Sequence, residues 1–241
     1  ISQDPPITSH IVNVSPPDRI PAQYQIYNDY HIYQTFNNCG PASLSMALSY
    51  YDIHVSQDIL GKALRPYQNS QGINDDKSVT LSELAVKSRD YSLTPYHRPG
   101  GTITILKQFI AHDIPVITRT LLHSSDDIGH FRVIKGYDDK TEEIIQDDSM
   151  QGHDLRYSYQ DFNAIWKPFG YEYLVLVPND KAEIVKEMLG DSYDEQKAWK
   201  HAVTYYNDML QQYPDDVSTV FNASVAYYHV GNYSKSIELF E

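Results

Sequence analysis

The chain has 241 residues, 41% of them hydrophobic and 21% charged, which is typical of a folded globular protein rather than a disordered one. Its formal net charge of −13 argues against a nucleic-acid partner and against docking on an anionic membrane. The single cysteine, Cys39, cannot form an internal disulfide, so its thiol is free for chemistry. No apolar run approaches the roughly 18 residues that a membrane helix needs, so no membrane insertion is expected within this chain.

The N-terminal residues differ in pattern from the rest of the chain. Residues 1–21 contain PP, SPP and IP without lasting periodicity, which predicts an extended arm on the domain surface. From Asn38 onward, Pro41 suits the first turn of a helix, and apolar residues then recur at helical spacing, namely Leu44, Ala47, Leu48 and Tyr51. The sequence therefore places Cys39 at the entry of a buried helix.

Helices are predicted to come first along the chain and strands later. Thr80 to Lys87 begins with a capping-box pattern, because Glu83 follows Thr80 by three places, and residues 104–112 form another helical segment. Four segments rich in Val, Ile, Tyr and Phe come next and are separated by turn residues: 114–122, 129–139, 142–149 and 171–178. This order favours an α+β fold with an antiparallel sheet.

The last 60 or so residues are predicted to be helical and to repeat. One apolar pattern occurs twice, 34 residues apart, at Trp199, Ala202, Val203 and Tyr206 and again at Tyr233, Ser236, Ile237 and Phe240. With Pro214 closing the unit, this period resembles the tetratricopeptide repeat, a helical module that stacks into a concave peptide-binding face. We expect residues 179–241 to form such repeats, to recruit a protein or peptide partner and to continue beyond Glu241. An ordinary amphipathic helical hairpin is the alternative.

Cys39 is a candidate nucleophile because of its predicted place in the fold. A thiol attacks well only as the thiolate, and a helix N-terminus favours that anion through its free N–H groups and aligned dipoles. Gly40 leaves room for a substrate to approach the backbone. Position alone leaves a second interpretation open, since a lone cysteine is more often a buried and inert side chain.

Two segments resemble the active site of the C39-type peptidases, a bacterial branch of the papain-like cysteine proteases that includes the leader-peptide-cleaving domains of peptide exporters. YQTFNNCGPASLSMALSYYD resembles the family's nucleophile helix, while GHFRVIKGYDD and IIQDDS resemble its histidine strand and acidic partner. The resemblance implies a papain-like peptidase domain over residues 22–178 and thiol-dependent hydrolysis of peptide bonds. It implies Cys39 as nucleophile, His130 as general base and acid, and Gln34 as a donor to the oxyanion. Gln34 precedes Cys39 by five positions, one fewer than in papain-like relatives.

The third catalytic residue is either Asp147 or Asp148. If the two strands form a hairpin that turns at Asp139, His130 lies opposite Asp148 and the carboxylate can hold the imidazole in its working tautomer. A slip of one residue would present Asp147 instead. The resemblance also favours Asp148, although the family's following proline is replaced by Ser149.

The remaining chemistry-bearing residues predict no cofactor and no metal site. The set His123, His130, His153, Asp126 and Asp127 lacks HExxH or paired-cysteine spacing, so metal catalysis is not expected. There is no glycine-rich phosphate loop.

Two other functions and the compartment stay open at this stage. A catalytically silent peptide-binding module would use the same groove, and an amidase or transpeptidase would use the same triad on another acyl donor or acceptor. The chain starts at Ile1 without Met or an apolar leader, as a trimmed chain or a mature exported form would. With 21 tyrosines and an acidic surface, a bacterial extracytoplasmic location, secreted or surface-anchored, is favoured over the cytoplasm.

Overall fold

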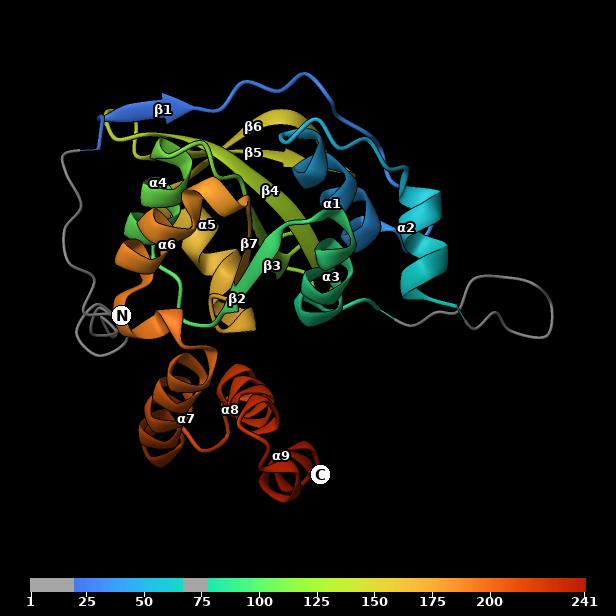
Figure 1. Cartoon of the computed structure of the whole chain (residues 1–241). Coiled ribbons are helices and arrows are strands. Elements are labelled where there is room, and N and C mark those ends of the chain that lie inside the picture. Colours follow the sequence, from blue (N-terminus) through green and yellow to red (C-terminus); the bar gives the residue numbers. More distant parts are fainter. Residues whose placement is uncertain (1–19, 67–77) are drawn as a thin grey trace.

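The computed structural model describes residues 20–66 and 78–241, so nearly all of the predicted arm at residues 1–21 lies outside the described residues (Figure 1). The elements in chain order are β1 (Gln23–Gln25), α1 (Cys39–Ser49), α2 (Gln57–Leu64), α3 (Leu81–Ser88), β2 (Thr94–Arg98), α4 (Ile103–Ala111), β3 (Val116–Leu121), β4 (Gly129–Asp138), β5 (Glu143–Asp148), β6 (Gly152–Ser158), α5 (Tyr159–Trp166), the 3-10 turn η3 (Lys167–Phe169), β7 (Tyr173–Val177), α6 (Ala182–Leu189), α7 (Glu195–Gln212), α8 (Val217–His229) and α9 (Tyr233–Phe240).

The described strands form one seven-stranded sheet in the order β2-β7-β3-β4-β5-β6, with β1 pairing to β4. Every strand pair is antiparallel, which confirms the predicted α+β class. β4 is long enough to pair with β3 along its first half and with β1 along its second half. Its first residues therefore lie at the end of the sheet where β3 and β5 also terminate.

Helices cover both faces of the sheet. Because side chains alternate along a strand, Phe131 and Val133 of β4 pack with α1 and α3, whereas Ile134 packs with α4, α5 and α6 on the other face. Figure 1 shows α1 to α3 on one side of the strands and α4 to α6 on the other. The buried α1 lies where the sequence predicts it, with Leu44, Ala47 and Leu48 in the core.

Local sequence signals set the ends of the predicted helices. The capping box of α3 is present: the Thr80 hydroxyl accepts from the Glu83 N–H at 3.2 Å, and the Thr80 N–H donates to the Glu83 carboxylate at 2.9 Å. The second predicted helix begins at Ile103 behind the cap Thr102. Both boundaries agree with the prediction to within one or two residues.

The C-terminal helices α7 and α8 pack against the sheet domain through aromatic side chains, and α9 packs on α8. Trp199 of α7 stacks on His229 of α8, with ring centroids 3.8 Å apart and planes 7° apart, and both rings contact His97 of β2. A Cβ at Gly170, which has φ +61°, would lie 2.7 Å from the Tyr206 hydroxyl. The helices predicted beyond residue 179 are therefore present and closely docked, whereas their membership of the tetratricopeptide class stays a prediction.

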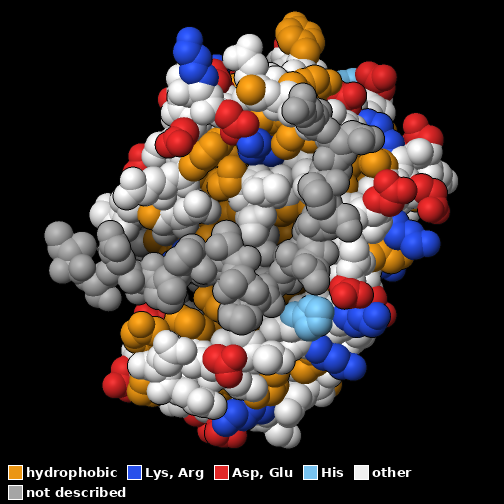
Figure 2. Space-filling view, turned by 90° about the vertical axis from the view of Figure 1, so that its left-hand side faces the viewer, with side chains coloured by type: hydrophobic (Ala, Val, Ile, Leu, Met, Phe, Trp, Pro, Cys, Tyr) orange, Lys and Arg blue, Asp and Glu red, His pale blue; other side chains and the backbone are white. Residues whose placement is uncertain are grey.

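The surface turned toward the viewer in Figure 2 mixes acidic, basic and hydrophobic side chains among the described residues, so neither sign of charge predominates there.

None of the helices in the described residues has the length and apolar character needed to cross a bilayer.

Gly101 supplies a test of the packing between the sheet and α5. A Cβ at this position would lie 2.5 Å from Cη2 of Trp166 and 2.8 Å from Cδ1 of Tyr173, both in the core. We expect Gly101→Ala to lower the free energy of unfolding by about 1–3 kcal/mol, because rigid ring atoms must move to make room. Urea denaturation measures the change. Lys140→Ala, at an exposed turn, is the control and should unfold like the wild type; a Gly101→Ala protein as stable as this control would contradict the packing.

Candidate active site

Cys39 is the first residue of α1, as predicted, and its side chain is half-buried. Gly40, directly after it, packs on the Phe131 ring of β4, since a Cβ there would lie 3.5 Å from the ring. The backbone N–H groups of Gly40, Phe131 and Cys39 act on the thiol as hydrogen-bond donors. The close approach of α1 to the start of β4 thus brings the thiol to the backbone of the residue directly after His130.

The helix N-terminus does not by itself make Cys39 a thiolate. Burial raises the pKa of the thiol, and the three backbone N–H groups together with the charge of Arg65 lower that pKa without overcoming the effect of burial. The N–H groups at the helix N-terminus thus favour the anion as expected, but burial outweighs them and the thiol stays protonated. Nucleophilic attack needs a group that removes the proton.

Arg65 is a buried cation that the sequence patterns do not single out. It comes directly after α2, and its guanidinium donates to the Asn37 carbonyl and to the Asn38 side-chain oxygen. Asn38 in turn donates to the Thr35 hydroxyl at 2.7 Å. A Cβ at Gly61 would lie 2.8 Å from the Asn38 side-chain oxygen, so α2 packs directly on the loop that precedes Cys39. Arg65 both fixes this loop and places positive charge near the thiol.

His130 is buried at the start of β4, with 1% of its surface exposed. Its Nε2 lies 2.9 Å from Oδ1 of Asp148. With the carboxylate accepting at Nε2, the neutral imidazole carries its proton there and Nδ1 is the basic nitrogen. No group among the described residues forms a hydrogen bond with Nδ1, and none joins His130 directly to the Cys39 thiol.

The strand register behind this contact differs from the prediction. Arg132, not His130, lies opposite Asp148, and a bulge between Ile134 and Gly136 shifts the hairpin register further. The predicted register was thus wrong by two residues. An even shift leaves a side chain on the same face of the sheet, so Asp148 reaches His130 along the diagonal between the strands.

Asp148 rather than Asp147 contacts the histidine. Besides His130, Oδ1 of Asp148 accepts the N–H groups of Met150 at 2.7 Å and Gln151 at 2.9 Å. Burial acts to raise the pKa of this carboxyl, but the hydrogen bond and charge of His130, the charge of Arg132 and the Met150 N–H prevail and lower it to about 2. Asp148 is thus a stable carboxylate at neutral pH.

Asp147 points to the other face and belongs to a separate cluster. Its carboxylate lies 2.8 Å from Nζ of Lys135 and 3.0 Å from Nδ1 of His153, and Lys135 also lies 2.6 Å from Asp154. Asp147, His153 and Asp154 have the spacing of metal ligands. The buried ammonium of Lys135 contacts both carboxylates, so the cluster is a salt-bridge network with a buried core of Lys135 and Asp147.

The histidines considered for a metal site are dispersed in the structure. His123 pairs with Asp126 at 2.6 Å, His130 with Asp148 and His153 with Asp147. Each imidazole is thus held by a different carboxylate, and of the three histidines His130 directly precedes Phe131, whose N–H donates to the thiol.

Arg132 forms a buried ion pair with the Asp148 carboxylate. Its Nε lies 3.0 Å from Oδ2 of Asp148, and both side chains are fully buried. The other guanidinium nitrogens donate to the carbonyls of Leu121 and Leu122, each at 2.7 Å, and to the Thr120 hydroxyl. Arg132 therefore ties Asp148 to the end of β3. Nothing in the strand pattern distinguishes this arginine from a surface residue.

Gln34 is placed beside the segment after Asp148. Its N–H donates to the Ser149 carbonyl at 2.8 Å, and its side-chain oxygen accepts the Ser149 hydroxyl at 2.8 Å. Nearby, Nε2 of His31 lies 2.9 Å from the Asp148 carbonyl. The contacts of Gln34 do not include Cys39 in the described part of the chain, so its role at the oxyanion stays a prediction.

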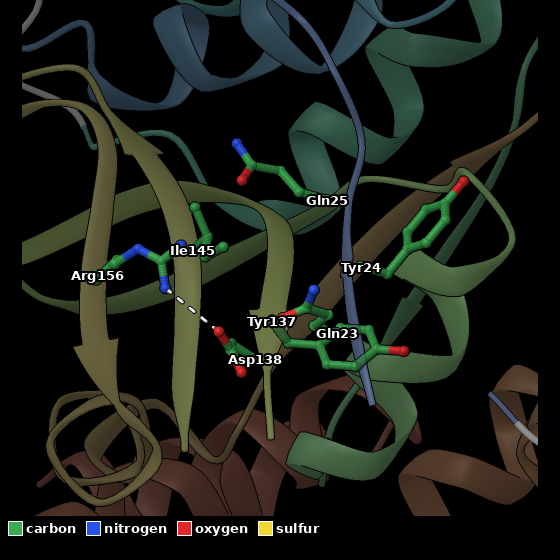
Figure 3. Close-up of a pocket in the computed structure, with 7 residues that line it drawn as sticks. All are labelled: Gln23, Tyr24, Gln25, Tyr137, Asp138, Ile145 and Arg156. Atoms are coloured by element: carbon green, nitrogen blue, oxygen red, sulfur yellow. Dashed lines mark ion pairs between the residues drawn. The ribbon is translucent and has the colours of Figure 1, made fainter. Parts of the chain in front are cut away.

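A cavity of about 370 Å³ lies at the opposite end of β4 from His130 (Figure 3). Its lining includes Asp138 and Arg156, whose charged atoms lie 4.0 Å apart, and side chains of β1. At about 3.3 Å per residue, Asp138 is roughly 26 Å along the strand from His130. This cavity is therefore separate from the cysteine and histidine.

Residues 18–174 match the Peptidase_C39 like family. Among solved structures, a C39-like peptidase from Bacillus anthracis has 17% identity and a TM-score of 0.53, covering 65% of this chain and 98% of its own. The peptidase domain of Streptococcus ComA, a bifunctional ABC transporter involved in quorum sensing, has 18% identity and a TM-score of 0.49, covering 65% of this chain and 99% of its own. The first likeness shows the fold. A search of curated protein sequences found no match.

Removing the charge of Arg65 should make Cys39 less reactive. That charge lowers the pKa of the thiol, so Arg65→Met should move the pH profile of iodoacetamide alkylation to higher pH and slow labelling at neutral pH roughly two- to tenfold. Arg65→Lys keeps the charge while losing the forked hydrogen bonds and should lie between the two proteins. Arg65→Met with a wild-type profile would show that the charge does not act on the thiol.

The lowered pKa of Asp148 predicts a particular acid response. A carboxyl whose folded pKa is about 2, against an ordinary value of 3.8, contributes stability that is complete above pH 4 and is lost as the pH falls toward 2. Urea unfolding between pH 6 and pH 2 should show the wild type losing on the order of 2 kcal/mol more than Asp148→Asn over this window. Identical pH dependence in the two proteins would contradict the buried ionic contact.

Proposed function

Since the chain belongs to the Peptidase_C39 like family, we propose that it hydrolyses peptide bonds with Cys39 as the nucleophile, His130 as the general base and acid, and Asp148 as the group that orients the imidazole. The observation that supports this most is the buried contact of 2.9 Å between His130 and Asp148. The backbone N–H of Phe131, the residue after His130, donates to the thiol. A buried ionic contact of this kind leaves one imidazole nitrogen basic and available.

The proposed reaction begins with proton transfer from the Cys39 thiol to Nδ1 of His130. The thiolate attacks the scissile carbonyl, and the imidazolium then gives its proton to the leaving amine as the thioester forms. Water, deprotonated by the same nitrogen, hydrolyses the thioester and frees the thiol. Since burial keeps the thiol protonated at rest, the ion pair forms only within the reaction, and hydrogen bonds of substrate-free sites commonly tighten once substrate binds.

The oxyanion of the tetrahedral intermediate needs preorganised donors. The N–H of Cys39 at the start of α1 is one. Gln34 is the second in this proposal: its side-chain oxygen is held by the Ser149 hydroxyl, so its amide nitrogen is the atom left to donate. The link to Ser149 would align Gln34 with the strand end that carries Asp148.

Exposed apolar side chains border the proposed site and support a peptide substrate. Phe36, Ile128 and Met150 are 73%, 55% and 51% exposed, and each lies within three residues of Cys39, His130 or Asp148. Apolar groups that stay exposed around a reactive centre are typical of a binding surface. We propose that they contact the side chains of the bound peptide.

The C-terminal helices extend this proposal. Residues 179–241, taken as a unit separate from the peptidase domain at 22–178, would recruit a protein or peptide partner as tetratricopeptide-like repeats. Supporting this, Tyr228, Tyr233 and Ile237 on α8 and α9 are 58%, 59% and 57% exposed, so these helices present apolar surface beyond the contact with the sheet domain.

Digestion of a peptide library, read by mass spectrometry, tests the proposed reaction. Wild type should cleave a subset of peptides, whereas Cys39→Ala and His130→Ala should cleave none at a detectable rate. Asp148→Asn should lose about 10²- to 10⁴-fold, because the imidazole then takes the wrong tautomer.

Asp147→Asn is the matched control, since this adjacent carboxylate lies on the other face and contacts Lys135. It should keep its activity when circular dichroism shows it folded. Peptide binding without cleavage by wild type would instead indicate a silent binding module. Cleavage that survives Cys39→Ala would exclude the thiol mechanism.

A further inference from the structure

Arg119 lies close to the proposed site and has no part in the catalytic steps above. It pairs with Phe131 across β3 and β4, so its side chain is on the face of the sheet that carries α1. A Cβ at Gly129 would lie 3.7 Å from Nε of Arg119 and 3.2 Å from Cζ of Phe169. The missing side chain at Gly129, directly before His130, makes the space in which the guanidinium lies.

Two aromatic rings hold the guanidinium from the side of the C-terminal helices. Its central carbon lies 4.4 Å from the centroid of Phe169 in η3 and 5.9 Å from that of Phe221 in α8. The two rings are 6.2 Å apart and nearly perpendicular. Contacts of a guanidinium with ring faces orient it without using its N–H donors.

The N–H donors of Arg119 are not used within the described part of the chain. The other buried arginines donate to several oxygens: Arg65 to two, Arg98 to three carbonyls and Arg132 to three oxygens. Arg119 makes no hydrogen bond or ion pair with any described residue and is only half-buried. Among the described residues, the buried polar atoms without a partner include none of its nitrogens, so its five donors remain open to solvent or to a ligand.

Two acidic groups, Glu172 and Cys39, act electrostatically on Arg119. Burial lowers the pKa of its guanidinium, and the nearby anionic forms of Glu172 and Cys39 raise it. The Glu172 carboxylate already contacts Nε2 of His97 at 3.3 Å. Cys39, in turn, is neutral at rest because its pKa is raised. The cation is thus within electrostatic reach of the thiol and of the Glu172 carboxylate, but neither forms a hydrogen bond with it in the described residues.

We propose that Arg119 binds a carboxylate of the peptide substrate next to the scissile bond, and that α8, through Phe221, forms one wall of this subsite. A planar fork of N–H donors fits a carboxylate in a bidentate manner, and such charge-assisted hydrogen bonds are the strong ones. The inference rests on the proposed peptidase function. It gives the C-terminal helices a direct part in substrate selection, and it defines the substrate as a peptide with an acidic side chain or a free C-terminus near the cleaved bond.

The test uses a peptide that the wild-type protein cleaves, remade in three forms. In one, each acidic residue near the bond is replaced by its amide; in another, the C-terminus is a carboxamide; the third is unchanged. Wild type should prefer the unchanged peptide by about ten- to a hundredfold in kcat/KM over the form that lacks the bound carboxylate. If the form with amides is cleaved poorly, Arg119 binds an acidic side chain. If the C-terminal carboxamide is cleaved poorly, it binds the C-terminal carboxylate.

In Arg119→Met this preference should vanish, so that the three peptides are cleaved with similar kcat/KM. Arg119→Lys should keep part of the preference, because it keeps the charge and loses the fork. Phe221→Ala should weaken the preference through a higher KM with little change in kcat.

The inference is overturned if wild type shows no preference for any carboxylate, a result that needs no variant to fold. It is also overturned if Arg119→Met slows all three peptides equally, which would show a purely structural role. Absence of any cleavage by wild type, with peptide binding to Cys39→Ala retained, would instead reject the proposed peptidase function. In that case a peptide that binds Cys39→Ala is remade in the same three forms, and calorimetric titration onto Cys39→Ala with and without Arg119→Met decides the carboxylate contact separately.

Discussion

The geometry of the candidate site depends on one buried ion pair, between the carboxylate of Asp148 and the guanidinium of Arg132. Asp148 accepts from His130 and from two N–H groups of the following turn, and the fully buried guanidinium of Arg132 lies 3.0 Å away. Removing one partner of such a pair leaves an uncompensated buried charge, at a cost of about 3–5 kcal/mol. Because Arg132 also binds the last carbonyls of β3, the ends of β3, β4 and β5 are joined through one ion pair.

This ion pair fixes the carboxylate that contacts the His130 imidazole. The carboxylate is held by several donors at once, so it does not rotate away from the imidazole, and its low pKa keeps it ionised across the pH range in which histidine titrates. The thiol lies in a different electrostatic setting, where burial outweighs its backbone donors. At neutral pH the Asp148 carboxyl is thus ionised, whereas the Cys39 thiol is protonated.

Local sequence signals predicted the elements that carry the site. The hairpin register and several short elements depend on non-local packing and were not predicted correctly. The entry of α1 at Cys39 and the capping box of α3 depend on residues within one turn, so they could be read directly. The hairpin register could not, because the strands pair at Asp138 and Glu143 on either side of the turn rather than around Asp139, and the bulge between Ile134 and Gly136 changes the offset again. Asp148 was still the right neighbour of His130, since the error was even and kept both side chains on one face. The short elements α2, β2, β6 and α5 were not predicted.

The arginines show the limit of sequence reasoning most clearly. Charged residues are rarely buried, so composition and periodicity place Arg65, Arg119 and Arg132 at the surface by default. In the structure Arg65 and Arg132 are buried and Arg119 half-buried, each within the framework around the thiol and imidazole. Only the packing of segments distant in sequence reveals this, as where α2 approaches the loop before Cys39 or where Phe169 and Phe221 enclose Arg119.

The strand order has a consequence for the timing of synthesis. β7 is the last strand in the chain, yet it is inserted between β2 and β3 and pairs with both. Leu174 and Leu176 of β7 also belong to the apolar layer beneath α1, so that layer stays incomplete while the ribosome is still translating the earlier strands. A nascent chain therefore contains Cys39 and His130 before the apolar layer beneath α1 is complete. The sheet and the apolar layer beneath α1 therefore become complete only after β7 has been synthesised.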